Sequence, residues 1–472
     1  MTARDAVRRA AMRHDAKRGS SRGILAALRA VVRATASLAP LLALAAPGAA
    51  AGADSDAGWV TVWTSSPQAA SGTFTDQTLR MIVSPRGAGS TLRLRLTNRY
   101  ATSPVTFAYV HVGRRAQGAA LVAGSNRRVT FGGARKVTVA AGETAVSDPV
   151  RLDVRPFEDL AVSIRVDGTT GPAPVHLIAS QTSYLTPPGA SVRGDEEDGG
   201  AYTRTTGSLY YLAALDVRPG RTEGAIGIIG DSITDGVAST PDTNRRWPDV
   251  LQRRLLAESR RARLAVLNAG IGGNQVTRDH AVFGDAAVNR IGPDLLELSG
   301  LRAVVFLEGI NDVAGNTPPR ASAAEIIDGY RSLIAAARAQ GLPVMALTLT
   351  PTAPNPNLPG HTDEQAVAVR HEVNHWLRTS GEVDAVFDAE AALSAADGSG
   401  VLGAAFDVGD GLHPNDAGMR AIAESVDLAA LLPLACRDAG NGPRLAGPAG
   451  PGAVRVDDPC RASPRLPLRP AR

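Results

Sequence analysis

Residues 225–236 read AIGIIGDSITDG and give the clearest indication of the fold class. The first five of these residues are apolar and predict a buried strand, and residues 230–236 then place glycine, serine and aspartate directly after that strand. Downstream, apolar runs alternate with segments of helical periodicity. Continuous apolar strands separated by helices indicate a parallel sheet that is covered on both faces. Residues 222–436 are therefore expected to form one doubly wound α/β domain.

The expected elements of this domain follow each other in five strand–helix units. Strands are expected at residues 225–229, 264–267, 303–307, 344–349 and 385–387, and helices at residues 247–256, 286–298, 323–339, 364–378 and 418–431.

The preceding part of the chain has a different period. Residues 55–217 contain short runs that alternate between apolar and polar side chains, such as LRLRL at residues 92–96. Turn-forming residues separate these runs. About ten such strands predict an all-β sandwich or jelly roll, joined to the α/β domain by a linker at residues 218–221.

Charge is concentrated at the two ends of the chain. The formal net charge is +4, but residues 1–51 hold nine Lys and Arg against two Asp, and residues 437–472 hold seven Arg against three Asp, so the part between them carries −7. A mildly acidic folded part argues against nucleic acid as a partner. The Gly/Pro-rich segment 437–472 is expected to be a tail.

Residues 1–51 have the order of an export signal. An Arg-rich stretch precedes a short apolar run at residues 38–46, and small residues follow it. The run is too short to span a bilayer, and no other stretch reaches that length. We therefore expect a secreted, extracellular protein without stable membrane insertion. The chain has two cysteines, Cys436 and Cys460. An exported protein can form a disulfide between them, and two unpaired thiols are the alternative.

Two motifs of the α/β domain contain residues that could act as a nucleophile and as the base that activates it. Ser232 follows the first strand, at the end of the sheet where doubly wound folds bind ligands. Asp410 stands three residues before His413, so its carboxylate can reach Nδ1–H of the imidazole and leave Nε2 free as a base. Taken singly, each has a structural alternative: a serine or an aspartate that caps a helix.

Two further blocks end neighbouring strands. Residues 268–274 read NAGIGGN and residues 309–312 read GIND. Glycine lets a backbone N–H approach a substrate oxygen, and an asparagine amide can donate a hydrogen bond into the same cleft. Turn formation is the alternative explanation of both blocks.

In this order, the four motifs resemble the SGNH (GDSL-type) serine esterases and lipases. The resemblance covers about residues 225–432 and implies a flavodoxin-like three-layer α/β/α domain that needs no cofactor. It implies Ser232 as nucleophile, His413 as base and Asp410 as the acid that orients it. The oxyanion donors would be Ser232 N–H, Gly273 N–H and the side chain of Asn311. The β-rich part resembles the accessory domain of some exported bacterial esterases, including ones that act on acetylated polysaccharides.

A competing motif lies on the helix expected at residues 364–378. His371, Glu372 and His375 match H-E-x-x-H, in which two histidines on one helix face bind zinc. No third ligand stands at the spacing of the extended motif, and Glu390 is an unsupported candidate. The sequence therefore predicts no metal site.

These motifs together predict a secreted ester hydrolase with an acyl-enzyme mechanism, acting on carbohydrate esters. A lipase or general carboxylesterase acting on lipid or small esters is the enzymatic alternative. A carbohydrate-binding surface protein with an inactive hydrolase domain is the alternative from another class.

Overall fold

The computed structural model describes residues 58–190, 194–218, 222–258, 263–315 and 317–436. The predicted signal segment 1–51, most of the predicted linker and the tail 437–472 lie outside the described residues. No helix in the described ranges is long and apolar enough to cross a membrane.

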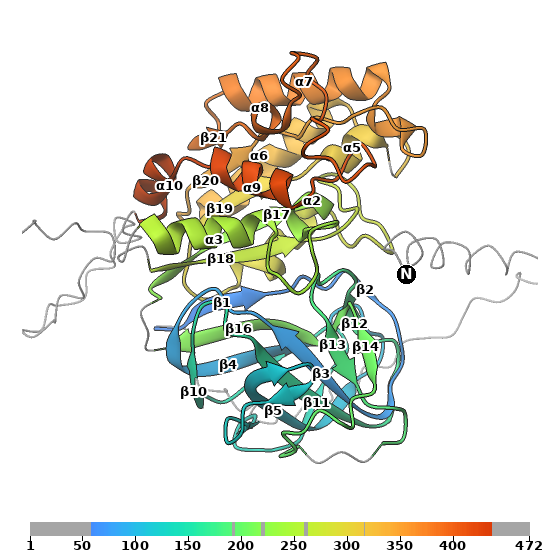
Figure 1. Cartoon of the computed structure of the whole chain (residues 1–472), viewed down its shortest axis with the longest axis vertical. Helices are drawn as coiled ribbons and strands as arrows, with labels where there is room; N and C mark the ends of the chain where they lie inside the picture. The colour runs from blue at the N-terminus through green and yellow to red at the C-terminus, as the bar shows by residue number, and fades with distance from the viewer. Residues whose placement is uncertain (1–57, 191–193, 219–221, 259–262, 316, 437–472) are drawn as a thin grey trace, which may run out of the picture. The chain divides into compact units, whose positions relative to one another are not determined.

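The α/β domain is built on a five-stranded parallel sheet in the order β18-β17-β19-β20-β21 (Figure 1). This is the 2-1-3-4-5 order of flavodoxin-like folds. The strands span β17 Gly224–Gly230, β18 Leu264–Gly270, β19 Leu301–Leu307, β20 Val344–Leu347 and β21 Ala385–Phe387. β17 lies between β18 and β19, so its carboxyl end, with the GDS motif, lies at the topological switch point.

Successive side chains of each strand point to opposite faces of the sheet and pack into two separate hydrophobic cores. Ile226 and Ile228 pack with the helices α3, α9 and α10, whereas Ala225 and Ile229 belong to the core that holds α6 and α7. The helices span α3 Trp247–Glu258, α6 Ala323–Ala339, α7 Glu364–Thr379, α9 Asp416–Ser425 and α10 Leu428–Ala435. The shorter elements are α2 Ser232–Asp235, α4 Ala287–Ile291, η2 Gly292–Leu296, α5 Ile310–Ala314, η3 Pro359–His361 and α8 Ala389–Leu393. The three-layer α/β/α class expected from the sequence is confirmed.

Two expected helices are broken. Residues 286–298 form α4 and then the π-helical turn η2, and residues 418–431 are divided between α9 and α10. The second break occurs because Val426 is extended and the Asp427 side chain accepts a hydrogen bond from Ala429 N–H, which caps a new helix.

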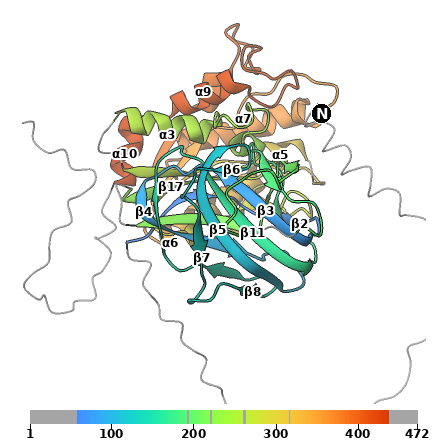
Figure 2. The same cartoon turned by 60° about the horizontal axis from the view of Figure 1, so that its bottom comes forward.

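The described residues of the N-terminal part form sixteen mostly short strands in antiparallel sheets, more than the ten expected. One sheet has the order β1-β16-β4-β10, with β9 also paired to β4, and a larger one has the order β14-β13-β3-β11-β5-β6. Figure 2 shows β3, β11 and β5 side by side in the larger sheet. A three-stranded sheet, β15-β12-β2, completes this part. The all-β class is confirmed, and the sandwich or jelly-roll architecture stays a prediction.

The strands of this part span β1 Val60–Thr64, β2 Ala69–Ala70, β3 Thr75–Val83, β4 Gly89–Thr97, β5 Val105–Gln117, β6 Ala120–Leu121, β7 Arg127–Val129, β8 Val137–Val139, β9 Thr144–Val146, β10 Val150–Val154, β11 Leu160–Thr169, β12 Pro174–His176, β13 Ser183–Leu185, β14 Arg204–Thr206, β15 Leu209–Tyr210 and β16 Leu212–Arg218. Both parts belong to one compact unit that begins at Gly58. The domain boundaries proposed from the sequence stay a prediction.

Candidate active site

Ser232 is the first residue of α2, and a single residue separates it from the carboxyl end of strand β17. The preceding Asp231 caps this helix, because its side chain accepts a hydrogen bond from Ile233 N–H at 2.9 Å. Gly230 is required at the strand end, since a Cβ there would stand 2.4 Å from the carbonyl oxygen of Leu307. The serine is 5% exposed. A tight strand-to-helix turn thus holds its hydroxyl at the end of the sheet where ligands bind.

The structure brings Ser232, His413 and Asp410 together. Nε2 of His413 lies 3.0 Å from Oγ of Ser232, and Nδ1 lies 2.7 Å from Oδ2 of Asp410. An ionised carboxylate only accepts hydrogen bonds, so Nδ1 carries the proton. The Nε2 lone pair then faces the serine hydroxyl, which donates to it.

The backbone around His413 holds Asp410 in place. Oδ1 of Asp410 accepts hydrogen bonds from the N–H groups of His413 and Leu412, at 2.8 and 3.0 Å. Burial acts to raise the pKa of Asp410, but these bonds and the imidazole lower it to about 2. The carboxylate therefore stays ionised over the pH range in which an imidazole works as a base.

Gly273 lies in a tight turn after β18. Asn274 N–H donates to the carbonyl of Ile271 at 3.1 Å, and Gly273 has a φ of +81°. A Cβ on Gly273 would also meet the Phe283 ring at 2.5 Å. Only glycine fits both conditions. Within the described residues, no acceptor is bonded to Gly273 N–H.

Asn311 reaches this turn from α5. Its Nδ2 donates to the carbonyl of Asn274 at 2.8 Å, and Nε2 of Gln275 donates back to the Asn311 carbonyl at 3.2 Å. The neighbouring Asp312 accepts from the N–H groups of Val276 and Thr277. These hydrogen bonds tie the GIND block to Asn274, the last residue of the glycine block, and to the three residues that follow it.

A family model matches the part of the chain that contains these residues. Residues 228–421, which include every residue of the site described above, match the GDSL-like Lipase/Acylhydrolase family. The chain carries a GDSL domain. The domain is accordingly that of a carboxylic ester hydrolase, as the sequence predicts.

The GDSL domain is similar to several solved structures. A putative acylhydrolase from Bacteroides fragilis is 21% identical, with a TM-score of 0.35 over 46% of this chain and 91% of that one. A GDSL-like lipase from Bacteroides thetaiotaomicron is 19% identical, with a TM-score of 0.35 over 46% and 93%. A catalytic mutant of an acetylxylan esterase from Geobacillus stearothermophilus is 20% identical, with a TM-score of 0.34 over 43% and 92%. No curated protein matches the chain.

Arg290 of α4 lies beneath the strand ends that carry the GDSL site and bonds to them. None of the sequence motifs contains this residue. This fully buried side chain donates to the carbonyls of Gly230 and Ala269, at the ends of β17 and β18, and to Oδ1 of Asn274. It thereby joins the strand that carries the serine to the glycine turn. Arg290 lies on a helix outside the motifs, so the sequence did not indicate that it contacts the site.

Two buried carboxyls lie near Arg290. Glu308 is fully buried, and Oε2 is 3.5 Å from the guanidinium. Burial raises the pKa of Glu308 well above its usual value and raises the pKa of Asp231 to about 7. The two acids are close enough that the charge of each disfavours ionisation of the other. The floor of the site thus carries less negative charge at neutral pH than its composition indicates.

The H-E-x-x-H residues lie on the outer face of α7. His371 has a 59% exposed side chain, and Nε2 lies 4.0 Å from Oε1 of Glu390. Glu390 also accepts a hydrogen bond from Arg378 at 2.7 Å, as part of a surface ion-pair network. In the described ranges, no group of three or more His, Cys, Asp or Glu is placed to hold a metal ion.

Cys436 ends the described part of the GDSL domain, directly after α10. Its expected partner Cys460 lies outside the described residues, so the pairing of Cys436 with Cys460 stays a prediction.

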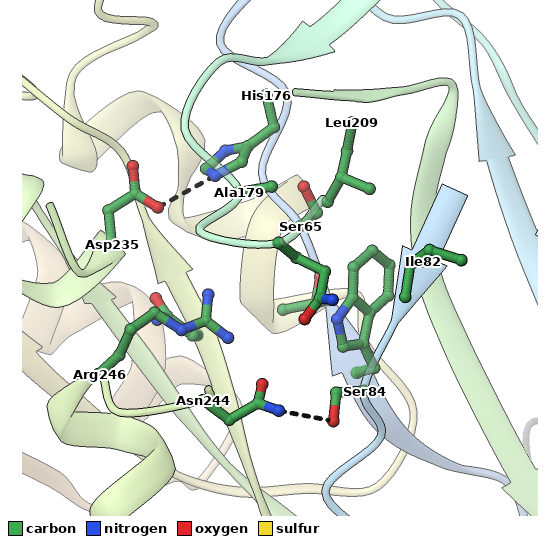
Figure 3. A pocket seen from close by; sticks show the side chains of 13 residues that line it. Ser65, Ile82, Ser84, His176, Ala179, Leu209, Asp235, Asn244 and Arg246 are labelled. Carbon is green, nitrogen blue, oxygen red and sulfur yellow. Dashed lines mark hydrogen bonds and ion pairs between the residues drawn. The ribbon is translucent and has the colours of Figure 1, made fainter. Parts of the chain in front are cut away.

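A residue of the β-rich part also reaches the site. His176 ends β12, and Nε2 lies 3.0 Å from Oδ1 of Asp235, the last residue of α2 (Figure 3). Neither residue is among the site residues that the sequence predicts. Asp235 lies inside the GDSITDG stretch and gave a positional signal, whereas His176 stands in a strand with no motif around it.

Proposed function

We propose that the GDSL domain hydrolyses esters through a covalent acyl-enzyme, with Ser232 as nucleophile, His413 as general base and Asp410 as the carboxylate that orients it. The observation that carries this proposal is the hydrogen-bonded series from Ser232 Oγ to His413 Nε2, at 3.0 Å, and from His413 Nδ1 to Asp410, at 2.7 Å. This is the geometry of a Ser-His-Asp triad, which is recognised by roles and distances rather than by chain order.

The first half of the reaction acylates the serine. Oγ of Ser232 attacks the ester carbonyl carbon while its proton passes to Nε2 of His413. The tetrahedral intermediate collapses, the carbon–oxygen bond to the alcohol breaks, and the alcohol leaves with the proton from Nε2. In the second half, a water gives its proton to Nε2 and attacks the acyl carbon. The carboxylic acid leaves as Ser232 recovers its proton.

The developing oxyanion needs donors on the side of the carbonyl away from His413. We assign this role to the N–H groups of Ser232 and Gly273 and to the side-chain amide of Asn311. Neither backbone N–H donates to another residue of the described part, and the bond from Asn311 to Asn274 fixes the plane of the amide. Donors held in this way cost no reorganisation when charge develops.

We further propose that the ester is a short acyl group, acetyl first, on a carbohydrate alcohol. An open pocket of about 420 Å³ is lined in part by His280. The His280 ring stacks on the Phe283 ring with 4.5 Å between centroids, and the Phe283 ring packs against Gly273 of the glycine turn. The lining of the pocket is largely polar and includes Gln68, Tyr100, Asp279, His280 and Asp285. Hydroxyl-rich groups hydrogen-bond to such side chains.

Few large hydrophobic side chains are exposed among the described residues. The large hydrophobic side chains that are exposed among the described residues are Val122, Val146, Leu256, Val282 and Val408. They do not form a broad groove of the kind that long acyl chains require. The lipase or general carboxylesterase alternative is therefore less well supported. Export, based on the signal pattern in residues 1–51, is part of the proposal because a polysaccharide substrate is met outside the cell.

The test compares the parent protein with Ser232→Ala on a panel of esters. Nitrophenyl acetate, butyrate and palmitate are assayed beside acetylated xylan, with acetate release as the second readout. We expect turnover of the acetyl substrates to fall by roughly 10³-fold or more in the variant, because the nucleophile is lost. Activity within a few-fold of the parent would reject the mechanism. A maximum on palmitate without acetate release from xylan would favour the lipase, and no turnover by the parent would favour the inactive binding protein.

A further inference from the structure

His176 is buried with its two ring nitrogens facing only acceptors. Nδ1 lies 2.9 Å from the carbonyl oxygen of Ser66, and Nε2 lies 3.1 Å from the carbonyl of Ile178 and 3.0 Å from Oδ1 of Asp235. A neutral imidazole has one donor nitrogen and one acceptor nitrogen. Either neutral form would turn a lone pair toward an oxygen. The arrangement is satisfied when both nitrogens carry hydrogen, so His176 is an imidazolium paired with the Asp235 carboxylate.

The electrostatics of the ring agree with its geometry. Burial acts to lower the pKa of His176, but Asp235 and the two carbonyl groups outweigh burial and raise it. Arg246 also lies close to Asp235, but it packs against Gly236 and donates to Asp249 at 2.9 Å. Arg246 is therefore engaged with a carboxylate of its own, and His176 remains the direct cationic partner of Asp235.

Asp235 connects His176 to the proposed oxyanion turn, because its two carboxylate oxygens bond to different partners. Its Oδ1 faces His176, whereas Oδ2 accepts a hydrogen bond from Gly272 N–H at 3.0 Å. Gly272 is the residue before Gly273, and both are central residues of the turn closed by the bond from Asn274 to Ile271. Asp235 thus holds the peptide that precedes the proposed oxyanion donor.

Both side chains of this pair are buried, with 6% of His176 and 2% of Asp235 exposed. A cavity of about 20 Å³, enough for roughly one water molecule, is lined by the pair and by side chains such as Ser84, Asn244 and Arg246 (Figure 3). Exclusion of bulk water strengthens an ion pair relative to a surface pair. The same burial makes removal of one partner costly, because the other charge is left uncompensated.

We propose that His176 is a positioning residue for the hydrolase, supplied by the β-rich part, which fixes the oxyanion turn at Gly272 and Gly273 through Asp235. This inference rests on the proposed function, because it assigns the turn the role of binding the oxyanion. It gives the β-rich part a direct role in the chemistry, in addition to any part it plays in substrate binding.

The experiment measures kcat and KM for nitrophenyl acetate in His176→Ala, His176→Gln, Asp235→Ala and the double alanine variant. We expect His176→Ala to lower kcat by about 10-fold or more with KM within about 3-fold, because an oxyanion donor acts mainly on the transition state. His176→Gln should recover part of the loss, since an amide N–H can donate to Asp235. The double variant should be no slower than Asp235→Ala alone.

His111→Ala is the matched control. His111 is also a buried histidine of the β-rich part, on β5, but burial lowers its pKa to about 4 and no described hydrogen bond joins it to the GDSL domain. It should retain the kcat of the parent. Thermal unfolding of each variant shows which of them are folded at the assay temperature.

The outcomes separate this inference from the proposed function. Three results would each overturn the positioning role, even where Ser232→Ala is inactive. The first is a kcat at the parent value in folded His176→Ala, and the second is a change in KM alone. The third is a double variant whose loss of kcat is the product of the losses in His176→Ala and Asp235→Ala. Activity retained by Ser232→Ala would instead reject the proposed function itself.

Discussion

At the residue scale, the amide of Asn311 offers a test of the oxyanion site that leaves the triad intact. Asn311→Ala should lower kcat by roughly 10²–10³, with little change in KM, because the amide stabilises charge that develops only in the transition state. Steady-state kinetics on nitrophenyl acetate measures both constants. The side chain also bonds to Asn274, so the variant needs a check of its thermal unfolding.

Asn357→Ala serves as the control for Asn311. Asn357 is exposed in the loop before η3, and its replacement should leave both constants at the parent values. An increase in KM at constant kcat in Asn311→Ala would make Asn311 a substrate-binding residue instead.

The proximity of the triad side chains could be anticipated from the sequence, but the contact of His176 could not. Ser232 directly follows a strand and His413 lies on the segment before the last helices, so parallel-sheet topology alone directs both to one edge. His176 meets Asp235 across 59 positions of chain and from a different sheet. No periodicity or motif in β12 indicates which side chain of the GDSL domain it faces.

At the element scale, the turn at residues 271–274 is the feature whose backbone matters most. Gly273→Ala should lower kcat by about 10-fold or more, because the methyl group meets the Phe283 ring and the residue has a positive φ. The same assay on nitrophenyl acetate gives the readout.

Gly341→Ala isolates the backbone part of this effect. Gly341 follows α6 with a φ of +72°, and a Cβ there would meet no atom within 4 Å. Its replacement should cost about 1–2 kcal/mol of unfolding free energy and leave kcat unchanged. Equal kcat in the two variants would show that the glycine turn does not act on the reaction.

The elements differ in how well local sequence defines them. Helix α6 has the predicted bounds, because Ser322 and Glu325 form a capping box at its start. The predicted helix over residues 418–431 is wrong, since its apolar spacing continues across the break at Val426. The spacing of apolar residues shows which face of a helix is buried. It does not show that a single residue between two buried helical turns has an extended backbone.

At the scale of the whole molecule, charged and polar contacts join the β-rich part to the GDSL domain. Arg86 of the β-rich part pairs with Asp249 of α3, and both side chains are buried. Thr61 N–H of β1 donates to the carbonyl of Ser299. The sequence predicted two regions from their different periods, but it contained no signal for these pairings, which depend on tertiary packing.

Covalent capture of the nucleophile shows whether one activated serine performs the chemistry. A fluorophosphonate reacts with an activated serine as Oγ attacks phosphorus and fluoride leaves. The intact protein should gain the mass of one adduct per chain, and peptide mapping should locate it on Ser232. Ser232→Ala should gain none, and His413→Ala should react far more slowly because the general base is lost. An adduct on another residue, or full labelling of Ser232→Ala, would contradict the account.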